Sequence, residues 1–346
     1  MPTTYAIPDG RTVMAATIWT GDGTNPRTIT NTVNGVSFKP DLVWTKARSN
    51  AYDNTLYDSV RGTTNYLISN STAAEASAAN TLQAFNSNGF QVGGNNFTNS
   101  GSVTYVGWQW QAGQGSTSSN TSGSITSTVS VNTTAGFSVV TWTNNNTANQ
   151  SVGHGLGVAP KMIITKDRDN GTFNWAVWFT GFTKDEYLLL NTTGAKASYN
   201  TLWYSVPDSS KFYIGSTGTG LNNGTDKMVA YCWASIPGFS AFGSYTGNGS
   251  ADGSFIYTGF QPAFILIKVS STVDEWVIFD NKRPAYNATN LRLNPNSSGA
   301  EQSTQPIDIL SNGFKLRGTG ANINGSGNTY IYAAFASNPF KNSNAF

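Results

Sequence analysis

The segment "FKPDLVWTKA" at residues 38–47 is the best guide to the fold, because it has the length of a buried strand and returns twice further along the chain. The related segments are "APKMIITKD" at 159–167 and "FQPAFILIKV" at 260–269. In each segment a lysine follows the proline by six positions. β-branched and aromatic residues, which are typical of strands, fill the positions between them. The sequence therefore predicts one kind of buried strand, used three times.

Other landmarks keep a fixed order around these segments. Gly136 precedes Pro160 by 24 positions, and Gly238 precedes Pro262 by the same number. Further on come a Leu-x-x-Asn motif ("LISN", "LLLN", "LRLN") and a closing aromatic strand ("YVGWQWQA", "MVAYCWA", "YIYAAFA"). A fixed order of anchors with variable loops between them indicates a repeated unit. We predict three repeats, at residues 1–112, 125–236 and 237–346, with residues 113–124 as a Ser/Gly/Thr linker.

The composition favours strands and turns. Charged residues make up 11% of the chain and aromatic residues 13%, whereas about 25% charged residues is usual. Short apolar segments alternate with Gly/Asn clusters, as in antiparallel sheets; residues 71–85 alone suggest a short helix. The expected fold class is all-β, with three tandem antiparallel β-sandwich domains that are jelly-roll-like or immunoglobulin-like. Each is expected to bury its own core, and the linker to be flexible.

The recurring lysine needs a partner, because it lies on the same face of its strand as apolar residues. Asp58 follows Lys46 by 12 positions, and an arginine comes three positions later. The third repeat has the same spacing, whereas the second has Phe179 and Phe182 near those places. We predict structural charge clusters, with a polar ligand site as the alternative. Their members are Lys46, Asp58 and Arg61 in the first repeat and Lys268, Asp280 and Arg283 in the third.

Few residues suit catalysis or metal binding. His154, in a glycine-rich loop, is the only histidine, so neither a hydrolase triad nor a histidine-based metal site is expected. The "DRDNG" segment at 167–171 is one residue short of a calcium loop and lacks its final acid. Asp274 and Glu275 are the most suggestive carboxylate pair, although a hairpin explains them equally well. We therefore expect no catalytic residue, metal or cofactor, and we expect Cys232 to be a small buried hydrophobe.

Sugar binding fits the composition better, because shallow carbohydrate sites combine flat aromatic rings with Asn, Asp and Gln. Trp142, Trp203 and Tyr204 lie at irregular places in the second repeat and are our candidates for a glycan platform. The net charge of +2, without a basic cluster, argues against nucleic acid. No apolar stretch approaches 18 residues and no signal peptide is evident, so we expect synthesis in the cytoplasm without membrane insertion.

The strings "FKPDLVWTKARS", "LYDSVRG", "LISNSTAAE", "LQAFNSNGFQVGG" and "YVGWQW" together make the first repeat resemble a known family. It is a domain of uncharacterised function, common in virion and tail-fibre proteins of phages, particularly phages of marine and cyanobacterial hosts. The resemblance is close over residues 38–110, looser in the third repeat, and limited to the outline in the second. It implies a lectin-like β-sandwich in a phage particle, and the family offers no established catalytic residues to transfer.

These observations lead to a hypothesis about function. We expect a non-enzymatic virion structural protein, made in the host cytoplasm and placed in the tail or a tail fibre, that presents lectin-like domains to host-surface glycan. Other virion proteins are the expected partners, and a homotrimer is favoured because fibres are usually symmetric. The alternatives are a capsid decoration or head-fibre protein and a carbohydrate-binding module of a secreted enzyme.

Overall fold

The computed structural model describes residues 4–284 and 286–339. The outer limits of the first and third predicted repeats, residues 1–3 and 340–346, lie outside the described residues. The chain is nearly all β, with 27 strands, one short α-helix and one 3₁₀ helix (Gly10–Thr12) in the described part. The strands that pair into sheets do so antiparallel, which confirms the all-β antiparallel class.

The first repeat folds into two sheets. Its strands are β1 (Met14–Thr20), β2 (Arg27–Thr30), β3 (Leu42–Ala47), β4 (Thr55–Asp58), β5 (Asn65–Ile68), β6 (Ala76–Ser77), β7 (Leu82–Asn86), β8 (Gly89–Val92) and β9 (Thr104–Trp110). The larger sheet has the order β1-β9-β3-β4-β5-β6, and the smaller has the order β2-β8-β7. The helix expected within residues 71–85 is wrong, because β6 and β7 occupy this segment and pair with β5 and β8.

The second repeat has a larger main sheet. Its strands, counted from the predicted linker, are β10 (Ser118–Asn120), β11 (Ser127–Asn132), β12 (Phe137–Thr143), β13 (Gln150–Gly153), β14 (Met162–Asp167), β15 (Ala176–Phe179), β16 (Glu186–Leu189), β17 (Ala197–Ser198), β18 (Lys211–Ile214) and β19 (Lys227–Trp233). Eight of them follow the order β10-β11-β12-β19-β14-β15-β16-β17, and β13 pairs with β18.

The third repeat has two four-stranded sheets. Its elements are β20 (Ser240–Thr246), β21 (Phe255–Tyr257), β22 (Phe260–Val269), β23 (Trp276–Asp280), β24 (Thr289–Arg292), β25 (Gln302–Leu310), β26 (Gly313–Leu316), α1 (Ala321–Asn324) and β27 (Thr329–Pro339). The sheet orders are β20-β27-β22-β23 and β21-β26-β25-β24. The order β20-β27-β22-β23 matches β1-β9-β3-β4 and β12-β19-β14-β15 position by position, so the main sheets share one topology.

The recurring segments form β3, β14 and β22, and every residue of these strands is buried. A strand buried on both faces must pack against something on each side. In the first repeat, Val43 and Ala47 pack with Leu82 and Phe90 of the smaller sheet. The opposite face of β3, with Leu42 and Trp44, enters a much larger apolar cluster.

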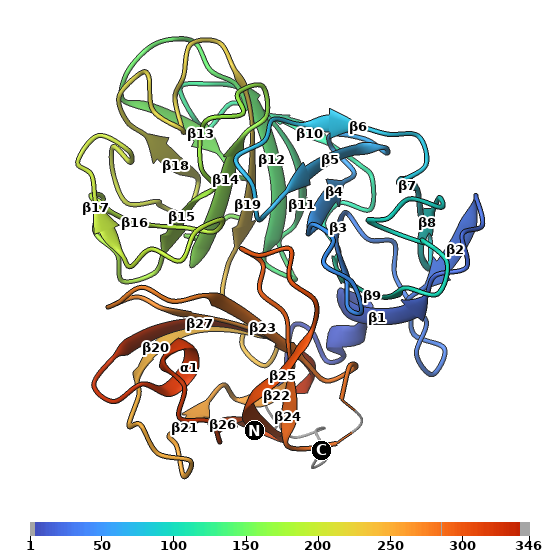
Figure 1. Cartoon of the computed structure of the whole chain (residues 1–346). Coiled ribbons are helices and arrows are strands. Elements are labelled where there is room, and N and C mark those ends of the chain that lie inside the picture. The colour runs from blue at the N-terminus through green and yellow to red at the C-terminus, as the bar shows by residue number, and fades with distance from the viewer. Residues whose placement is uncertain (1–3, 285, 340–346) are drawn as a thin grey trace.

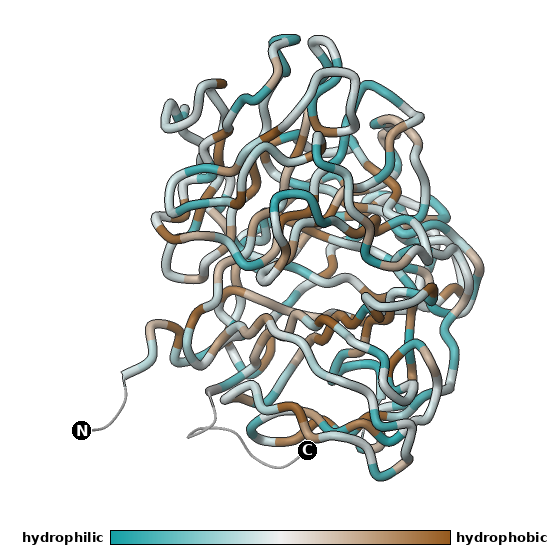
Figure 2. Tube along the Cα trace, turned by 90° about the vertical axis from the view of Figure 1, so that its left-hand side faces the viewer, coloured by the Kyte–Doolittle hydropathy of each residue, from teal (hydrophilic) through white to brown (hydrophobic). Residues whose placement is uncertain are grey.

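That larger cluster contains residues of all three repeats. At its centre the ring of Trp110 lies 5.9 Å from Trp233 and 5.6 Å from Phe335. These three aromatic residues close their respective repeats. Their partners in the recurring strands are Leu42 for Trp110, Met162 for Trp233 and Phe264 for Phe335. Figure 1 shows the three groups of strands, blue, green and orange to red, around a common centre, and Figure 2 shows apolar segments in the interior. The expectation that each repeat buries only its own core is wrong.

The expected flexible linker at 113–124 is also wrong, because part of it is β10, which pairs with β11. Its beginning is held by the buried carboxylate of Asp41, which accepts the backbone N–H groups of Ala112, Gln114 and Gly115 at 2.7–2.8 Å. Small polar residues favour such N–H···carboxylate turns as readily as they favour disorder. Within the described residues, no helix is long and apolar enough to cross a membrane.

Candidate functional site

The recurring lysine holds backbone carbonyl groups. Lys46 is fully buried, and its ammonium group donates to the carbonyls of Ala47 at 2.9 Å, Tyr52 at 2.7 Å and Ser298 at 2.9 Å, with a longer contact to Asn50. Ser298 belongs to the third repeat. Burial lowers the pKa of Lys46 to about 8. The lysine therefore fixes its own hairpin loop and ties it to a neighbouring repeat.

The predicted pairing of this lysine with an aspartate is wrong. Antiparallel pairing of β3 with β4 places Asp58 opposite Leu42, at the far end of the strand from Lys46. The same holds in the third repeat, where Asp280 lies opposite Phe264. There Lys268 donates to the carbonyls of Asp274 at 2.8 Å and of Thr193, in the second repeat, at 3.1 Å.

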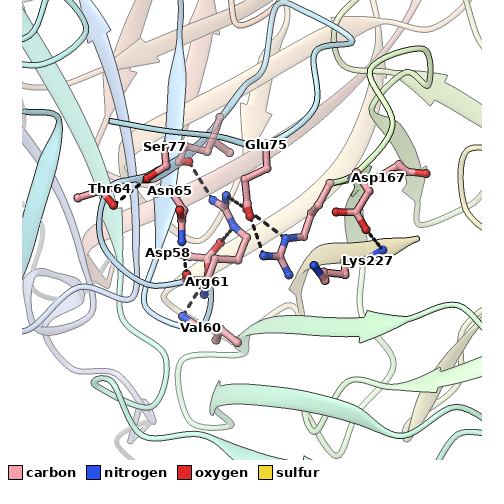
Figure 3. Close-up of polar contacts among 12 residues, drawn as sticks. Asp58, Val60, Arg61, Thr64, Asn65, Glu75, Ser77, Asp167 and Lys227 are labelled. Atoms are coloured by element: carbon pink, nitrogen blue, oxygen red, sulfur yellow. Dashed lines mark hydrogen bonds and ion pairs between the residues drawn. The ribbon is translucent and has the colours of Figure 1, made fainter. Parts of the chain in front are cut away.

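The aspartate and arginine do form the predicted pair. Asp58 Oδ2 lies 2.5 Å from Arg61 Nε, and both side chains are fully buried. Arg61 also contacts Glu75 at 2.7 Å, and Tyr231 of the second repeat donates its hydroxyl to Asp58 at 2.8 Å. Figure 3 shows Arg61 between Asp58 and Glu75. The pair is thus part of a contact between the first and second repeats.

Glu75 extends this contact. Its other carboxylate oxygen lies 2.7 Å from Arg168 of the second repeat. Burial raises the pKa of Glu75, but the hydrogen bonds and positive charge of Arg168 and Arg61 outweigh this effect and hold the pKa below its ordinary value. The carboxylate is therefore ionised and bridges two arginines from different repeats.

The third repeat repeats the arrangement toward the first. Asp280 Oδ2 lies 2.6 Å from Arg283 Nε, and the indole N–H of Trp108 in the first repeat donates to the same carboxylate at 2.9 Å. Glu301 contacts Arg283 at 3.0 Å and Arg48 of the first repeat at 2.8 Å. Trp108 and Tyr231 occupy corresponding positions in β9 and β19, two residues before Trp110 and Trp233.

The second repeat faces the third with apolar side chains. Phe179 takes the place of the aspartate, packs against Phe182 at 6.1 Å, and contacts Phe242 of the third repeat at 6.3 Å. The position of Trp108 and Tyr231 is held here by Ala333, which has no hydrogen-bonding side chain. Both sides of this contact have therefore changed together.

Backbone hydrogen bonds close the cycle. The N–H groups of Glu75, Lys196 and Glu301 hold corresponding positions and donate to carbonyls of the next repeat at 2.7–2.8 Å. Their acceptors are Arg168, Ser270 and Arg48, so the first repeat contacts the second, the second the third, and the third the first. The Asp–Arg pairs lie at these contacts between repeats, and the lysines are not part of them.

The predicted glycan platform is not formed. Trp142 and Trp203 are buried, and Trp142 donates its indole N–H to Asn144 at 2.9 Å. Only Tyr204 is exposed, at 49%, with its ring 6.2 Å from Tyr213. The irregular positions of the two tryptophans reflect variation in the core, so the ring faces are not available to a ligand. This part of the prediction is wrong.

The remaining candidates have structural surroundings. His154 is buried, with Nε2 3.1 Å from the carbonyl of Asp208 and Nδ1 accepting the N–H of Leu156; burial lowers its pKa. Glu275 accepts a hydrogen bond from Asn296, and Asp274 contributes its carbonyl to Lys268. Cys232 is buried, as predicted, and burial raises its pKa.

A pocket of about 380 Å³ opens beside the loop that Lys46 fixes. Its aromatic side chains are Tyr52 and Phe97, and its polar side chains are Asp53, Asn80, Asn95 and Asn96. Phe97 is backed by Tyr66 at 5.5 Å. Asp53 is oriented by Asn70, whose amide donates to Oδ1 at 2.7 Å. Aromatic rings beside amide and carboxylate groups suit a hydroxyl-rich ligand.

The second repeat has a pocket at the corresponding place, between the loop after β14 and the loop before β19. It measures about 140 Å³, and its walls are more apolar: Phe173, Asn174, Ala176, Tyr187, Leu189, Tyr199, Leu202 and Gly220. Phe173 and Asn174 correspond to Tyr52 and Asp53, since Trp175 and Asn54 both directly precede the next strand. The position of the pocket is shared, whereas its chemistry is not.

The residues that line the first pocket could not be identified from the sequence, because they lie far apart along the chain. Tyr52–Asp53 and the segment "GNNF" at 94–97 are separated by about forty residues, and only the pairing of β3 with β9 brings their loops together. The best clue was the recurring lysine, which marks the hairpin loop on one side of the pocket.

Comparison with known proteins identifies a family. No curated protein and no solved structure matches the chain. A family model described as a domain of unknown function (DUF7483) matches residues 10–339, across all three predicted repeats. The chain belongs to this family.

Proposed function

We propose that the chain is a non-enzymatic virion structural protein of a phage, in the tail or a tail fibre, that attaches to host-surface glycan through the pocket of the first repeat. In this proposal the chain consists of three β-sandwich domains closed into one rigid block. Host-surface sugar and neighbouring virion proteins are its partners, and the phage assignment is supported by the resemblance of residues 38–110 to virion domains.

The observation that carries the proposal is the pocket bounded by Tyr52 and Phe97. Hydroxyl-rich ligands need donors and acceptors that are not already paired. Asp53 Oδ2 and the amide of Asn96 make no hydrogen bond within the described residues, and Asn80 and Asn96 are exposed. Lys46 holds the carbonyl of Tyr52, so the aromatic wall is fixed before a ligand arrives, which reduces the entropy lost on binding.

The closed cycle of repeats supports a mechanical role. Each repeat contacts the other two through buried polar or apolar groups, which favours a body that moves as one unit. The match of a single family model to residues 10–339 agrees with such a unit. A homotrimer remains part of the proposal for a fibre, although the three repeats of one chain already contact one another in a closed cycle. Light scattering, which separates the mass of one chain from that of three, tests this point.

Glycan binding is tested by screening the purified chain on an array of bacterial surface polysaccharides and measuring the hits by calorimetry. We expect N80A and N96A each to weaken binding about tenfold, since each removes one hydrogen bond at the pocket. The matched control is N200A, an exposed asparagine of the second repeat, which should bind like wild type. If no glycan binds, or if all three variants bind equally well, the attachment role is wrong.

A further inference from the structure

The strands β1, β12 and β20 occupy the same place in the three main sheets, each beside the closing strand of its repeat. Their register is also the same, since Met14, Phe137 and Ser240 lie opposite the closing aromatic residues. In the second repeat, β11 pairs with the other side of β12. In the described part of the chain β1 and β20 have no such neighbour, so each forms the edge of its sheet.

The first repeat is longer than the third directly before its recurring strand. Asn31 and Thr258 correspond, because each donates its N–H to the asparagine carbonyl of an "SNGF" segment. Their side chains also correspond, since each donates to the carbonyl of a following phenylalanine, Phe38 or Phe260. Seven positions separate Asn31 from Phe38, whereas only two separate Thr258 from Phe260.

The additional residues of the first repeat lie beside its edge strand. They form a tight hairpin in which Val33 and Val36 are bridged. Val33 lines a small pocket together with Met14 and Ala16 of β1. The second repeat thus covers the edge of its sheet with β11, and the first covers it with this hairpin. Within the described residues, the third repeat has neither cover over β20.

The outer edge of β20 presents unpaired backbone groups. Alternate residues of an antiparallel strand turn their N–H and C=O groups toward the partner strand or away from it. Phe239 and Gly247 bond toward β27. The groups of Phe242, Ser244 and Thr246 therefore point outward, and they have no hydrogen-bond partner in the part of the chain described. Ser244 and Thr246 are exposed to solvent.

The sequence of β20 does not protect this edge. Natural edge strands are kept from pairing by charged residues, proline, bulges or short length. β20 has seven residues, "SAFGSYT", without a charge or a proline, and its pairing with β27 is regular. The corresponding side of β12 accepts β11, which indicates that the fold leaves space for one more strand.

We propose that β20 pairs antiparallel with β20 of a second copy of this chain, which joins two main sheets into one. The register follows from the groups that are available. The N–H of Ser240 already donates to the carbonyl of Ile236 at 2.9 Å. The free groups are those of Phe242, Ser244 and Thr246, and a register centred on Ser244 uses all of them.

In this register the strand is complementary to itself. Phe242 lies opposite Thr246, Gly243 opposite Tyr245, and Ser244 opposite the partner's Ser244. No like charges meet, and an aromatic ring opposite a glycine is a favourable pair at a sheet edge. Such a contact has twofold symmetry and closes on two chains. It does not depend on the proposed glycan binding, and in the proposed trimer it would join two trimers into six chains.

Light scattering of the full chain, from micromolar to submillimolar concentration, tests the proposal. We expect the mass of two chains, or of six, at the upper end of this range. S244K should fold, because Ser244 is exposed, and should lose the pairing, because two lysines would lie directly opposite each other. The matched control S209K changes an exposed serine of the second repeat and should associate like wild type. A mass of one or three chains throughout, or a paired S244K, would overturn the proposal.

Two further measurements locate the contact. Hydrogen exchange at residues 242–246 should slow as wild type associates and should stay fast in S244K. S244C should form a disulfide between two chains on mild oxidation, since paired residues of neighbouring strands lie within reach of such a bond, whereas S209C should not. The native Cys232 is buried and does not compete. Association without slower exchange at these residues, or equal cross-linking of S244C and S209C, would place the contact elsewhere and overturn the proposal.

Discussion

Two kinds of contact join the repeats, and they solve the same packing problem differently. Where the first repeat meets the second, a buried Asp58–Arg61 pair receives the hydroxyl of Tyr231. Where the second meets the third, Phe179 packs against Phe242. The polar version needs a matching hydrogen-bond donor from the neighbour, whereas the apolar version needs only volume. The contact between the third repeat and the first, with Asp280 and Trp108, belongs to the polar kind.

The comparison indicates that the residues on the two sides of a contact differ together from one contact to the next. A buried ion pair is stable when every oxygen and N–H group has a partner, and replacing the whole pair by apolar residues can be neutral. Removing one member leaves a buried charge. Each Asp–Arg pair has a donor across the contact. Phe179 instead meets Phe242, whose strand partner is Ala333, a residue that donates nothing through its side chain.

The largest effect is expected from breaking the polar contact on one side. R61A should lower the free energy of unfolding by about 3–5 kcal/mol, because it leaves the carboxylate of Asp58 buried without its main partner. Urea unfolding followed by tryptophan fluorescence measures the loss.

The matched comparison converts the polar contact into the apolar kind. D58F/R61F/Y231A copies Phe179, Phe182 and Ala333, and it should be more stable than R61A although it changes three residues. If the triple variant is the less stable of the two, the contacts do not change as sets and the comparison fails.

Removing the recurring lysine should have the next largest effect. K46M should cost about 2–3 kcal/mol, because a charged donor to several carbonyls is lost and some of them stay buried. K166M should cost less, since Lys166 donates to two carbonyls, both in its own repeat. Hydrogen exchange should increase around residues 50–53 and 297–299 in K46M only. Equal costs for the two variants would mean that the link between repeats adds no stability.

Much of the fold could be predicted from the sequence, because strand pattern and repeated spacing are local signals. The strands β3, β14 and β22 appear where the recurring segments stand. The closed cycle could not be predicted in this way. A strand buried on both faces reads the same whether its second face meets a smaller sheet or another repeat, and nothing near Trp110 indicates that Trp233 and Phe335 lie beside it.

The candidate sites show the same division. The Asp–Arg pairs were predicted from a spacing of three residues, which is local. The lysine partners were not, because backbone carbonyls leave no trace in the sequence, and antiparallel pairing puts residues 12 apart at opposite ends of a hairpin here. The aromatic platform failed because burial of Trp142 and Trp203 depends on the whole fold.

A smaller effect should follow from deleting one donor of a polar contact. W108F removes both indole volume and the hydrogen bond to Asp280, whereas W44F removes indole volume alone, since Trp44 Nε1 has no partner in the part of the chain described. The two rings are neighbours at 6.0 Å. We expect W108F to cost about 1–2 kcal/mol more than W44F, measured by urea unfolding. An equal cost would show that the hydrogen bond contributes no net stability.

The smallest effect concerns pH. The pKa of Glu75 is lower in the folded chain than in the unfolded one. Its stabilising contribution is therefore complete above the ordinary glutamate pKa, and it is lost as the pH falls through the lower pKa of the folded chain. Wild type should therefore exceed E75Q in free energy of unfolding by about 1 kcal/mol at pH 7, and the two should converge toward pH 3. A gap that stays constant with pH would assign the effect to packing.

The contact between the second and third repeats has Lys196 in place of Glu75, and Lys196 is paired with Glu186 of its own repeat. K196Q should therefore leave the hydrogen exchange of that contact unchanged. This result would separate a charge that bridges two repeats from a charge paired within one repeat.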